Sequence, residues 1–169
     1  MRRLAFIGVL AIIAVVAAVV FFFGGFFNVA ENVDNPGIVD WALATVRMAS
    51  INRHAADKPT ISLDDPATVQ AGARAFLAAG CVHCHGAPGV NWTKFSEGLR
   101  PYPADLKQIG KDNDPSQIFW AVKNGIKFTG MPSFGAAGSS DQDLWTIVAF
   151  IKKLPTVTEA DFKTWTTPP

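Results

Sequence analysis

Apolar residues dominate the beginning of the chain. Residues 4–27 read LAFIGVLAIIAVVAAVVFFFGGFF and contain no charged or strongly polar side chain. As an α-helix this segment would be about 36 Å long, which is enough to cross the roughly 30 Å hydrocarbon core of a bilayer. The pattern therefore predicts a transmembrane anchor within residues 1–30.

A cleaved signal peptide is the alternative interpretation of this segment. The apolar core of a signal peptide is normally only about 7 to 15 residues and ends at small residues. Here Phe26, Phe27 and Asn28 stand where small residues would be needed, so we expect an uncleaved, single-pass anchor. Arg2 and Arg3 precede the span and no base directly follows it, so the N-terminus should be cytoplasmic and the rest exported.

Apolar residues recur at helical spacing in four later segments. Three of them open on an Asx-Pro pair, which is typical of an N-cap followed by proline at the first helical position. Ser140 and Asp143 form the pattern of a capping box at the start of the fourth. The pairs are Asn35-Pro36, Asp65-Pro66 and Asp114-Pro115, and the expected helices are 37–53, 66–79, 115–123 and 140–155. No segment alternates as a strand would, so we predict an all-α fold.

The exported part is expected to have two regions. Residues 31–65 are predicted to form a juxtamembrane amphipathic helix and a polar linker, and residues 66–169 a folded domain. One side of the juxtamembrane helix carries Ile38, Trp41, Thr45 and Met48. We expect this helix to lie on the bilayer or on the folded domain, with Trp41 as its interfacial anchor.

The stretch of residues 86–113 shows little periodicity and contains three prolines. A loop of this length is unusual in a compact domain unless something organises it. A large buried cofactor would do so. Nucleic acid is a poor candidate partner, because the formal net charge is only +1 and no basic run is interleaved with aromatic residues.

The two cysteines lie in the segment Cys81-Val82-His83-Cys84-His85, which is the attachment pattern of a c-type haem. On one helical turn, positions i, i+3 and i+4 project to the same side. Cys81, Cys84 and His85 would therefore converge on one object. The spacing predicts one covalently bound haem c, with its iron held by His85.

Other uses of this motif are less well supported by the sequence. A zinc site needs four ligands, and the remaining histidines, His54 and His83, do not have ligand spacing. A thioredoxin-like dithiol would require a strand–helix context and gives no role to the histidine that follows. We expect His54 to be a solvated linker residue and His83 to be exposed.

A second iron ligand should come from Met131, which is the only methionine after the haem motif. Pro132 disfavours the helical region for the residue before it, and glycines at 130 and 135 let the chain pass close to a flat object. We therefore expect an extended strap that carries the Met131 thioether to the iron.

With these motifs, residues 66–155 resemble the single-haem class I cytochromes c, and are especially similar to the haem domains of bacterial respiratory chains. The resemblance implies the class I fold, in which a few helices and long loops wrap around one haem. The matching residues are Gly72, Phe76, CVHCH at 81–85, Pro103-Ala104-Asp105-Leu106, Gly130-Met131-Pro132, Ile147 and Phe150.

The resemblance also implies roles for individual residues. Gly72 and Phe76 would cross the helix that carries Ile147 and Phe150. The carbonyl of Pro101 or Pro103 would accept a hydrogen bond from the second nitrogen of His85, which orients the ring. Tyr102 or Trp120 would donate to a haem propionate. These residues complete the predicted haem-binding set.

An iron held by His85 and Met131 has no open position for a substrate. We therefore expect an electron carrier rather than an enzyme, with redox proteins as partners and no small-molecule substrate. Its place would be the periplasmic face of a bacterial inner membrane, between a quinol-oxidising complex or dehydrogenase and a terminal oxidase. A fixed subunit of a larger oxidoreductase and a haem-based sensor are the alternatives. Lys123 and Lys127 are expected to form a basic lip for docking.

Overall fold

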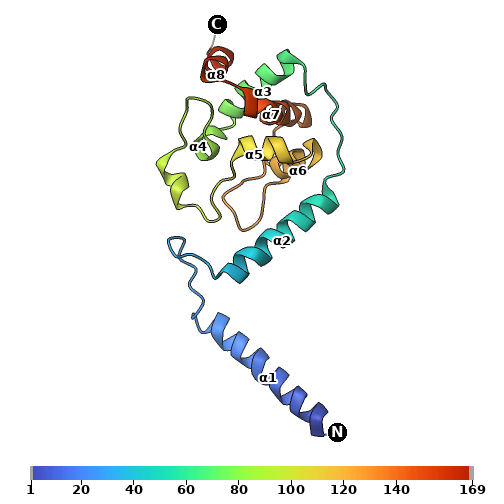
Figure 1. Ribbon diagram of the computed structural model, residues 1–169, viewed down its shortest axis with the longest axis vertical. Coiled ribbons are helices and arrows are strands. Elements are labelled where there is room, and N and C mark those ends of the chain that lie inside the picture. The colour runs from blue at the N-terminus through green and yellow to red at the C-terminus, as the bar shows by residue number, and fades with distance from the viewer. Residues whose placement is uncertain (1, 168–169) are drawn as a thin grey trace. The chain divides into compact units, whose positions relative to one another are not determined.

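A computed structural model of the chain describes residues 2–167 (Figure 1). Within this range the polypeptide is helical, and the only β pairing is an isolated bridge between Ala87 and Val90. The elements are α1 (Arg2–Phe23), α2 (Gly37–His54), α3 (Pro66–Ala78), α4 (Val82–His85), η1 (Lys94–Gly98), α5 (Leu106–Asp112), α6 (Pro115–Asn124), α7 (Asp141–Lys153), η2 (Leu154–Thr156) and α8 (Glu159–Thr166). The predicted all-α class is confirmed.

The chain divides after Asn35 into two compact units. The first contains α1, which has no buried residue and is long and apolar enough to cross a membrane. This helix ends at Phe23, before the end of the apolar run at residue 27, because Gly24 and Gly25 follow and glycine is a poor helix former. At 22 residues the helix is still about 33 Å long.

The second unit begins at Pro36, and its helices start mostly where their caps predict. The Asp65 side chain accepts a hydrogen bond from Thr68 N–H, and Ser140 accepts one from Asp143 N–H. The prediction for Asn35 was wrong, because the N-cap of α2 is Pro36 and α2 has no side-chain cap. Proline therefore stands one position earlier than expected at this helix.

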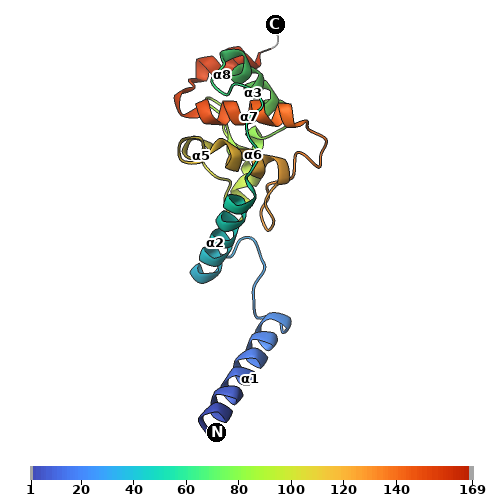
Figure 2. The same ribbon diagram turned by 90° about the vertical axis from the view of Figure 1, so that its right-hand side faces the viewer.

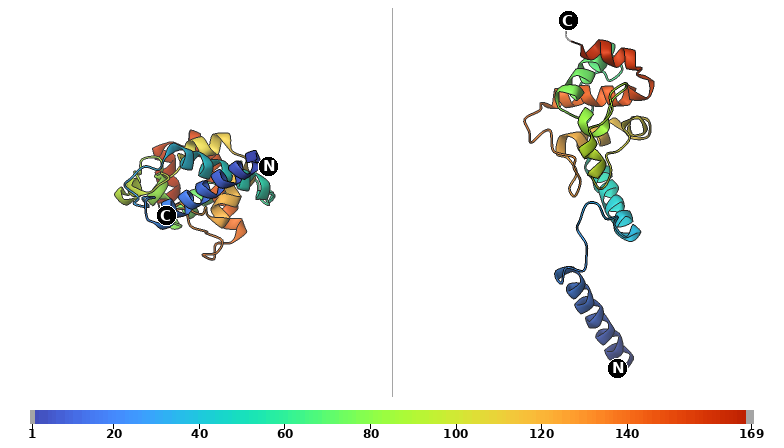
Figure 3. Two further views of the ribbon diagram at one scale, coloured as in Figure 1. Left: turned by 90° about the horizontal axis from the view of Figure 1, so that it is seen from below. Right: turned by 90° about the vertical axis from the view of Figure 1, so that its left-hand side faces the viewer.

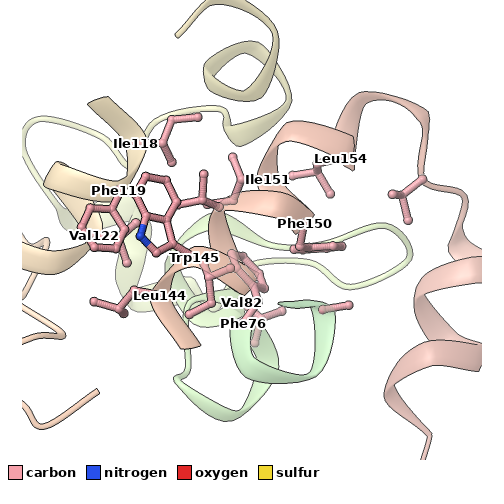
Figure 4. Close-up of a cluster of buried hydrophobic side chains, with 14 of the residues drawn as sticks. Phe76, Val82, Ile118, Phe119, Val122, Leu144, Trp145, Phe150, Ile151 and Leu154 are labelled. Carbon is pink, nitrogen blue, oxygen red and sulfur yellow. The ribbon is translucent and has the colours of Figure 1, made fainter. Parts of the chain in front are cut away.

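The core forms where α3 crosses α7 (Figure 4). A Cβ at Gly72 would lie 1.9 Å from the carbonyl oxygen of Thr146, so only glycine allows this approach of the two backbones. Next to the crossing, the rings of Phe76 and Phe150 are 5.2 Å apart, and Ile147 is buried in the same cluster. The helix crossing implied by the resemblance is thus confirmed.

The core continues from α7 to α6 through stacked aromatic rings. Trp145 and Phe119 lie 4.0 Å apart between centroids and are inclined by only 7°. Both side chains are almost completely buried, and large aromatic rings contribute much of the burial energy of a small core. This contact joins the helix before the methionine segment to the helix that crosses α3.

Two short helices were not predicted from the sequence. The helix α5 has seven residues and α8 has eight, which is too short for apolar periodicity to be recognised. The helix α8 packs on α3, where Arg74 donates a hydrogen bond to the Trp165 carbonyl. Figures 2 and 3 show α3, α7 and α8 at one end of the second unit and α2 at the other.

The helix α2 is attached to the second unit through its C-terminal turns. Ile51 is buried, the Asn52 side chain accepts a hydrogen bond of 2.6 Å from Gln117, and the ring of His54 stacks on Trp120 of α6. His54 is exposed, as expected, but it belongs to the last turn of α2 and not to the linker. These contacts attach α2 to α6, so α2 belongs to the same compact unit as the helices that follow it.

Candidate haem site

The predicted attachment motif forms one short helical turn. Cys81 is the N-cap of α4, and the backbone N–H groups of Cys84 and His85 both bond to the Cys81 carbonyl, at 3.2 and 3.0 Å. This turn brings the two thiols and the imidazole to one side. The cysteines are both free and half-buried, and Val82 of the same turn is buried in the core. The core therefore holds the motif in place.

The imidazole of His85 is oriented by a distant part of the chain. Its Nδ1 lies 2.9 Å from the carbonyl oxygen of Ala104. A carbonyl can only accept, so Nδ1 carries the proton and Nε2 has its lone pair available for a metal. Burial lowers the pKa of His85, while the bond to Ala104 acts in the opposite direction. The imidazole is thus suited to bind iron in its neutral form.

The predicted partner of His85 needs correction, because the carbonyl belongs to Ala104 and not to Pro101 or Pro103. Neighbouring carbonyls of an extended segment point in different directions, so a shift of one residue changes the acceptor. Directly after Ala104, Asp105 caps α5 by accepting a hydrogen bond from Lys107 N–H at 2.8 Å. The start of α5 therefore determines which carbonyl faces His85.

The thiol of Cys81 differs from that of a redox-active dithiol. Its pKa is raised to about 11, mainly by burial and to a smaller extent by the neighbouring Cys84. Dithiol oxidoreductases instead use a thiol whose pKa is lowered, so that the thiolate is available. The environment of Cys81 therefore disfavours the thioredoxin-like interpretation.

Met131 lies on a loop that we call the methionine strap, residues 125–135. Met131 is half-buried and packs against the hydrophobic core. Three hydrogen bonds attach the end of the strap to the last turn of α6: Phe134 N–H to Val122 O, Gly135 N–H to Lys123 O, and Ser133 Oγ to Lys123 O. The strap is thus fixed to a core helix, although it contains no helix of its own.

The strap turns back on itself at Gly125. This residue has a φ of 68°, and a Cβ here would lie 2.7 Å from the carbonyl carbon of Pro132. Within the loop, Met131 N–H donates to Thr129 Oγ1 and its carbonyl accepts from Ile126 N–H. Glycine is needed at position 125 both for the left-handed backbone and for the close packing.

Comparison with known families identifies the domain. A sequence model of the family described as cytochrome c oxidase, cbb3-type, subunit III matches residues 67–151, which is half of the chain. The chain belongs to this family. No curated protein and no solved structure matches the chain. The chain is therefore a cytochrome c with a helical haem domain, and electron transfer is the activity that this class suggests.

The donor set of this cytochrome fits a c-type haem. Two thiols on one turn suit the two attachment points at a porphyrin edge, and a neutral imidazole and a thioether are both established haem-iron ligands. Cys81 and Met131 pack against the same hydrophobic core, so elements 50 residues apart in the sequence meet at one cluster. Haem binding by these residues stays a prediction.

The remaining predicted haem contacts have other partners in the structure. Tyr102 is 61% exposed, and the Arg100 guanidinium lies 3.9 Å above its ring. Trp120 is half-buried and stacks on His54. Pro103 directly precedes the Ala104 carbonyl that orients His85. Haem contacts by these three residues stay predictions, and Arg100 was missed because neither periodicity nor a motif marks it.

The predicted basic lip is reduced by an ion pair. Lys123 Nζ lies 2.8 Å from Asp141 Oδ2, and this hydrogen bond is the main reason that the pKa of Lys123 is raised. Its charge is therefore balanced locally. Lys127, on the strap, is exposed. The sequence could not show this because Lys123 and Asp141 are 18 residues apart.

Proposed function

We propose that this chain is a membrane-anchored c-type cytochrome that transfers single electrons in a periplasmic respiratory chain. It would accept them from a quinol-oxidising complex or dehydrogenase and pass them to a terminal oxidase. The observation that carries the proposal is the CVHCH turn, with the His85 imidazole held by the Ala104 carbonyl at 2.9 Å. That geometry leaves Nε2 available for iron.

Each ligand residue has a separate role in this proposal. Cys81 and Cys84 would hold one haem c through thioethers, and His85 and Met131 would bind its iron. A haem c with these ligands supplies a one-electron ferric/ferrous couple. The Ala104 carbonyl orients the imidazole, and Met131 would leave no position on the iron open to a substrate. No residue has to transfer a proton or form a new bond with a substrate, so the chain acts as a carrier and not as an enzyme.

Pro103, Tyr102 and Trp120 complete the proposed haem surroundings. Pro103 restricts the backbone directly before Ala104, and Tyr102 or Trp120 would donate to a propionate. The Tyr102 ring lies under Arg100, so a propionate near Tyr102 would also meet a positive charge.

The anchor places the carrier at the bacterial inner membrane. The proposal rests on α1, whose length and composition suit a single membrane span, and on Arg2 and Arg3 before it. By the positive-inside rule the haem domain would be periplasmic. Anchoring would limit the carrier's search for partners to two dimensions.

A second candidate is a permanently bound cytochrome c subunit of a larger membrane oxidoreductase. The family match favours it, because the family is described by an oxidase subunit. Purification from native membranes in a mild detergent distinguishes a free carrier from a fixed subunit. A carrier should migrate alone, whereas a fixed subunit should comigrate with catalytic subunits through several columns.

Covalent haem attachment is the central test. The purified chain should contain one haem that acid-acetone does not extract, and the Cys81→Ser, Cys84→Ser double variant should release its haem or contain none. The matched control is a Ser50→Cys variant, which adds a thiol outside the motif and should leave haem content unchanged. Extraction of the colour from the unaltered chain would contradict thioether attachment and the proposed function.

A further inference from the structure

The helix α2 buries Ile51 against its own domain and leaves several other large apolar side chains exposed. Arg47, Ile51 and His54 are spaced by four and three residues and so share one face, which meets α6 through Ile51 and His54. The opposite side is apolar. Exposed fractions there are 68% for Ile38, 64% for Trp41 and 67% for Val46. We call Ile38, Trp41, Val46 and Met48 the free face of α2.

We propose that the free face of α2 lies at the boundary between lipid headgroups and acyl chains, in the membrane that α1 spans. This goes beyond electron transfer, because it assigns α2 a lipid-binding surface. It rests on one part of the proposed function, namely the membrane anchor. Figure 2 shows the N-terminal turns of α2 extending away from the helices around the core, and Ile38 and Trp41 on these turns are mostly exposed.

Chain connectivity keeps α2 near the membrane. The helix α1 ends at Phe23 and α2 begins at Gly37, so 13 residues connect them. Even when fully extended, 13 residues reach at most about 45 Å. A helix within this distance of a bilayer can exchange water for lipid on its apolar side without any further tether.

The chemistry of α2 favours lipid over a protein groove. Tryptophan is enriched at membrane–water interfaces because its ring is apolar and its N–H is polar. The helix also contains two arginines against one aspartate, which gives it a charge of +1 with His54 neutral. Helices that lie in the interface combine an apolar face with basic residues in this way.

Interfacial binding of α2 would restrict the orientation of the haem domain. The C-terminal turns of α2 are attached to α6 by the Asn52–Gln117 hydrogen bond and the His54–Trp120 stack. A helix held at the bilayer surface would therefore carry the domain with it. The haem domain would rest in a limited range of tilts instead of rotating freely on its linker.

Spin labels on the full haem-loaded chain can test this inference. Cys81 and Cys84 are the only cysteines, and in the haem-loaded chain both are thioethers, so an introduced cysteine is the sole reactive thiol. The probes are Ile38→Cys and Val46→Cys on the free face. The controls are Leu77→Cys, an exposed apolar position on α3, and Val16→Cys within α1.

The chain is placed in nanodiscs of phosphatidylethanolamine and phosphatidylglycerol, and each label is exposed to oxygen, which concentrates in lipid, or to a water-soluble nickel chelate. We expect the oxygen-to-nickel accessibility ratio at 38 and 46 to be several-fold higher than at 77. Equal ratios would place the free face in water and overturn the proposal. Immobile labels that neither reagent reaches would indicate a protein occupant and also overturn it.

The Val16→Cys label separates this inference from the anchor. Lipid contact at 16 together with water contact at 38 and 46 would contradict only the proposal on α2. Absence of lipid contact at 16 would contradict the anchor, and with it the membrane part of the proposed function. The haem absorption spectrum should be the same in all four variants, because none of the labelled positions belongs to the proposed haem site.

Discussion

The two segments that carry the proposed iron ligands are held in different ways. His85 lies on a helical turn whose shape follows from local hydrogen bonds to Cys81, and one distant carbonyl orients its ring. Met131 lies on a loop whose position depends on bonds to the last turn of α6 and on the tight turn at Gly125. The first ligand is thus defined mainly by local sequence and the second mainly by tertiary contacts.

This difference predicts that ligation by Met131 is lost more easily than ligation by His85. A helical turn buried through Val82 loses its geometry only when the domain unfolds. The strap can be displaced by breaking a few hydrogen bonds while the helices remain folded, since local opening is governed by local contacts. Substitutions in the strap should therefore change ligation before they change the fold.

The largest effect is expected for Met131→Ala. Removing the thioether should open one coordination position, allow carbon monoxide to bind at neutral pH, and lower the reduction potential within the roughly 0.8 V range that axial ligands span. Carbon monoxide difference spectra and a redox titration would measure this. The control is Met48→Ala, on the exposed side of α2, which should change neither. An unaltered potential in Met131→Ala would remove this residue as the ligand.

A second strong effect is expected for Gly125→Ala. The added Cβ would lie 2.7 Å from the Pro132 carbonyl carbon at a φ of 68°, so the strap must move. We expect a loss of about 2 kcal/mol or more in the free energy of unfolding, with partial loss of methionine ligation.

Gly138→Ala is the matched control for that substitution. Gly138 has a φ of 97° but no atom within 4 Å of its Cβ position, so it carries backbone strain without a clash. The Gly138→Ala substitution should lower the free energy of unfolding by about 1 kcal/mol and leave methionine ligation intact. Urea unfolding measures both variants. If Gly125→Ala and Gly138→Ala lose the same free energy of unfolding and have the same haem spectra, the close packing at Gly125 does not hold the strap.

A smaller effect is expected on the histidine side from Asp105→Ala. Loss of the α5 cap should lower the free energy of unfolding by about 1 kcal/mol. It should also make the Ala104 carbonyl that orients His85 more mobile, which would shift the haem spectrum slightly. Thr158→Ala, which removes the cap of α8, should cost a similar amount without a spectral change. If both variants alter the spectrum alike, the link from Asp105 to His85 is absent.

The smallest effect on stability is expected from lowering the pH. Hydrogen bonds from Thr68 lower the pKa of Asp65 below its ordinary value of 3.8, and bonds from Thr158 do the same for Asp161. Their contribution to stability is complete above pH 3.8 and is lost as the pH falls through the lowered folded-state values.

Hydrogen exchange at several acidic pH values would compare the first turn of α3 with the methionine strap. The first turn of α3, which Asp65 caps, should lose protection as the pH falls through this range. The strap contains no carboxylate, so its exchange should not acquire the same pH dependence. Asp65→Asn should flatten the response at α3, because asparagine caps without titrating.

Local chemistry explains what could be predicted from the sequence. The starts of α3 and α7 were correct because a cap depends on residues three positions apart. The CVHCH turn was correct because the i, i+3, i+4 geometry belongs to any helix. The helices α5 and α8 were missed because seven or eight residues carry too little periodicity.

By itself, the sequence determined the apolar first helix, the all-α class and the haem-attachment turn, since each follows from neighbouring residues. Only the tertiary structure decided that Ala104 faces His85 and that Asp141 neutralises Lys123. It also decided that α2 packs on α6 through its C-terminal turns. These contacts join residues 18 to 65 positions apart. Such pairs form only after the core has brought their helices together, and no short-range pattern encodes them.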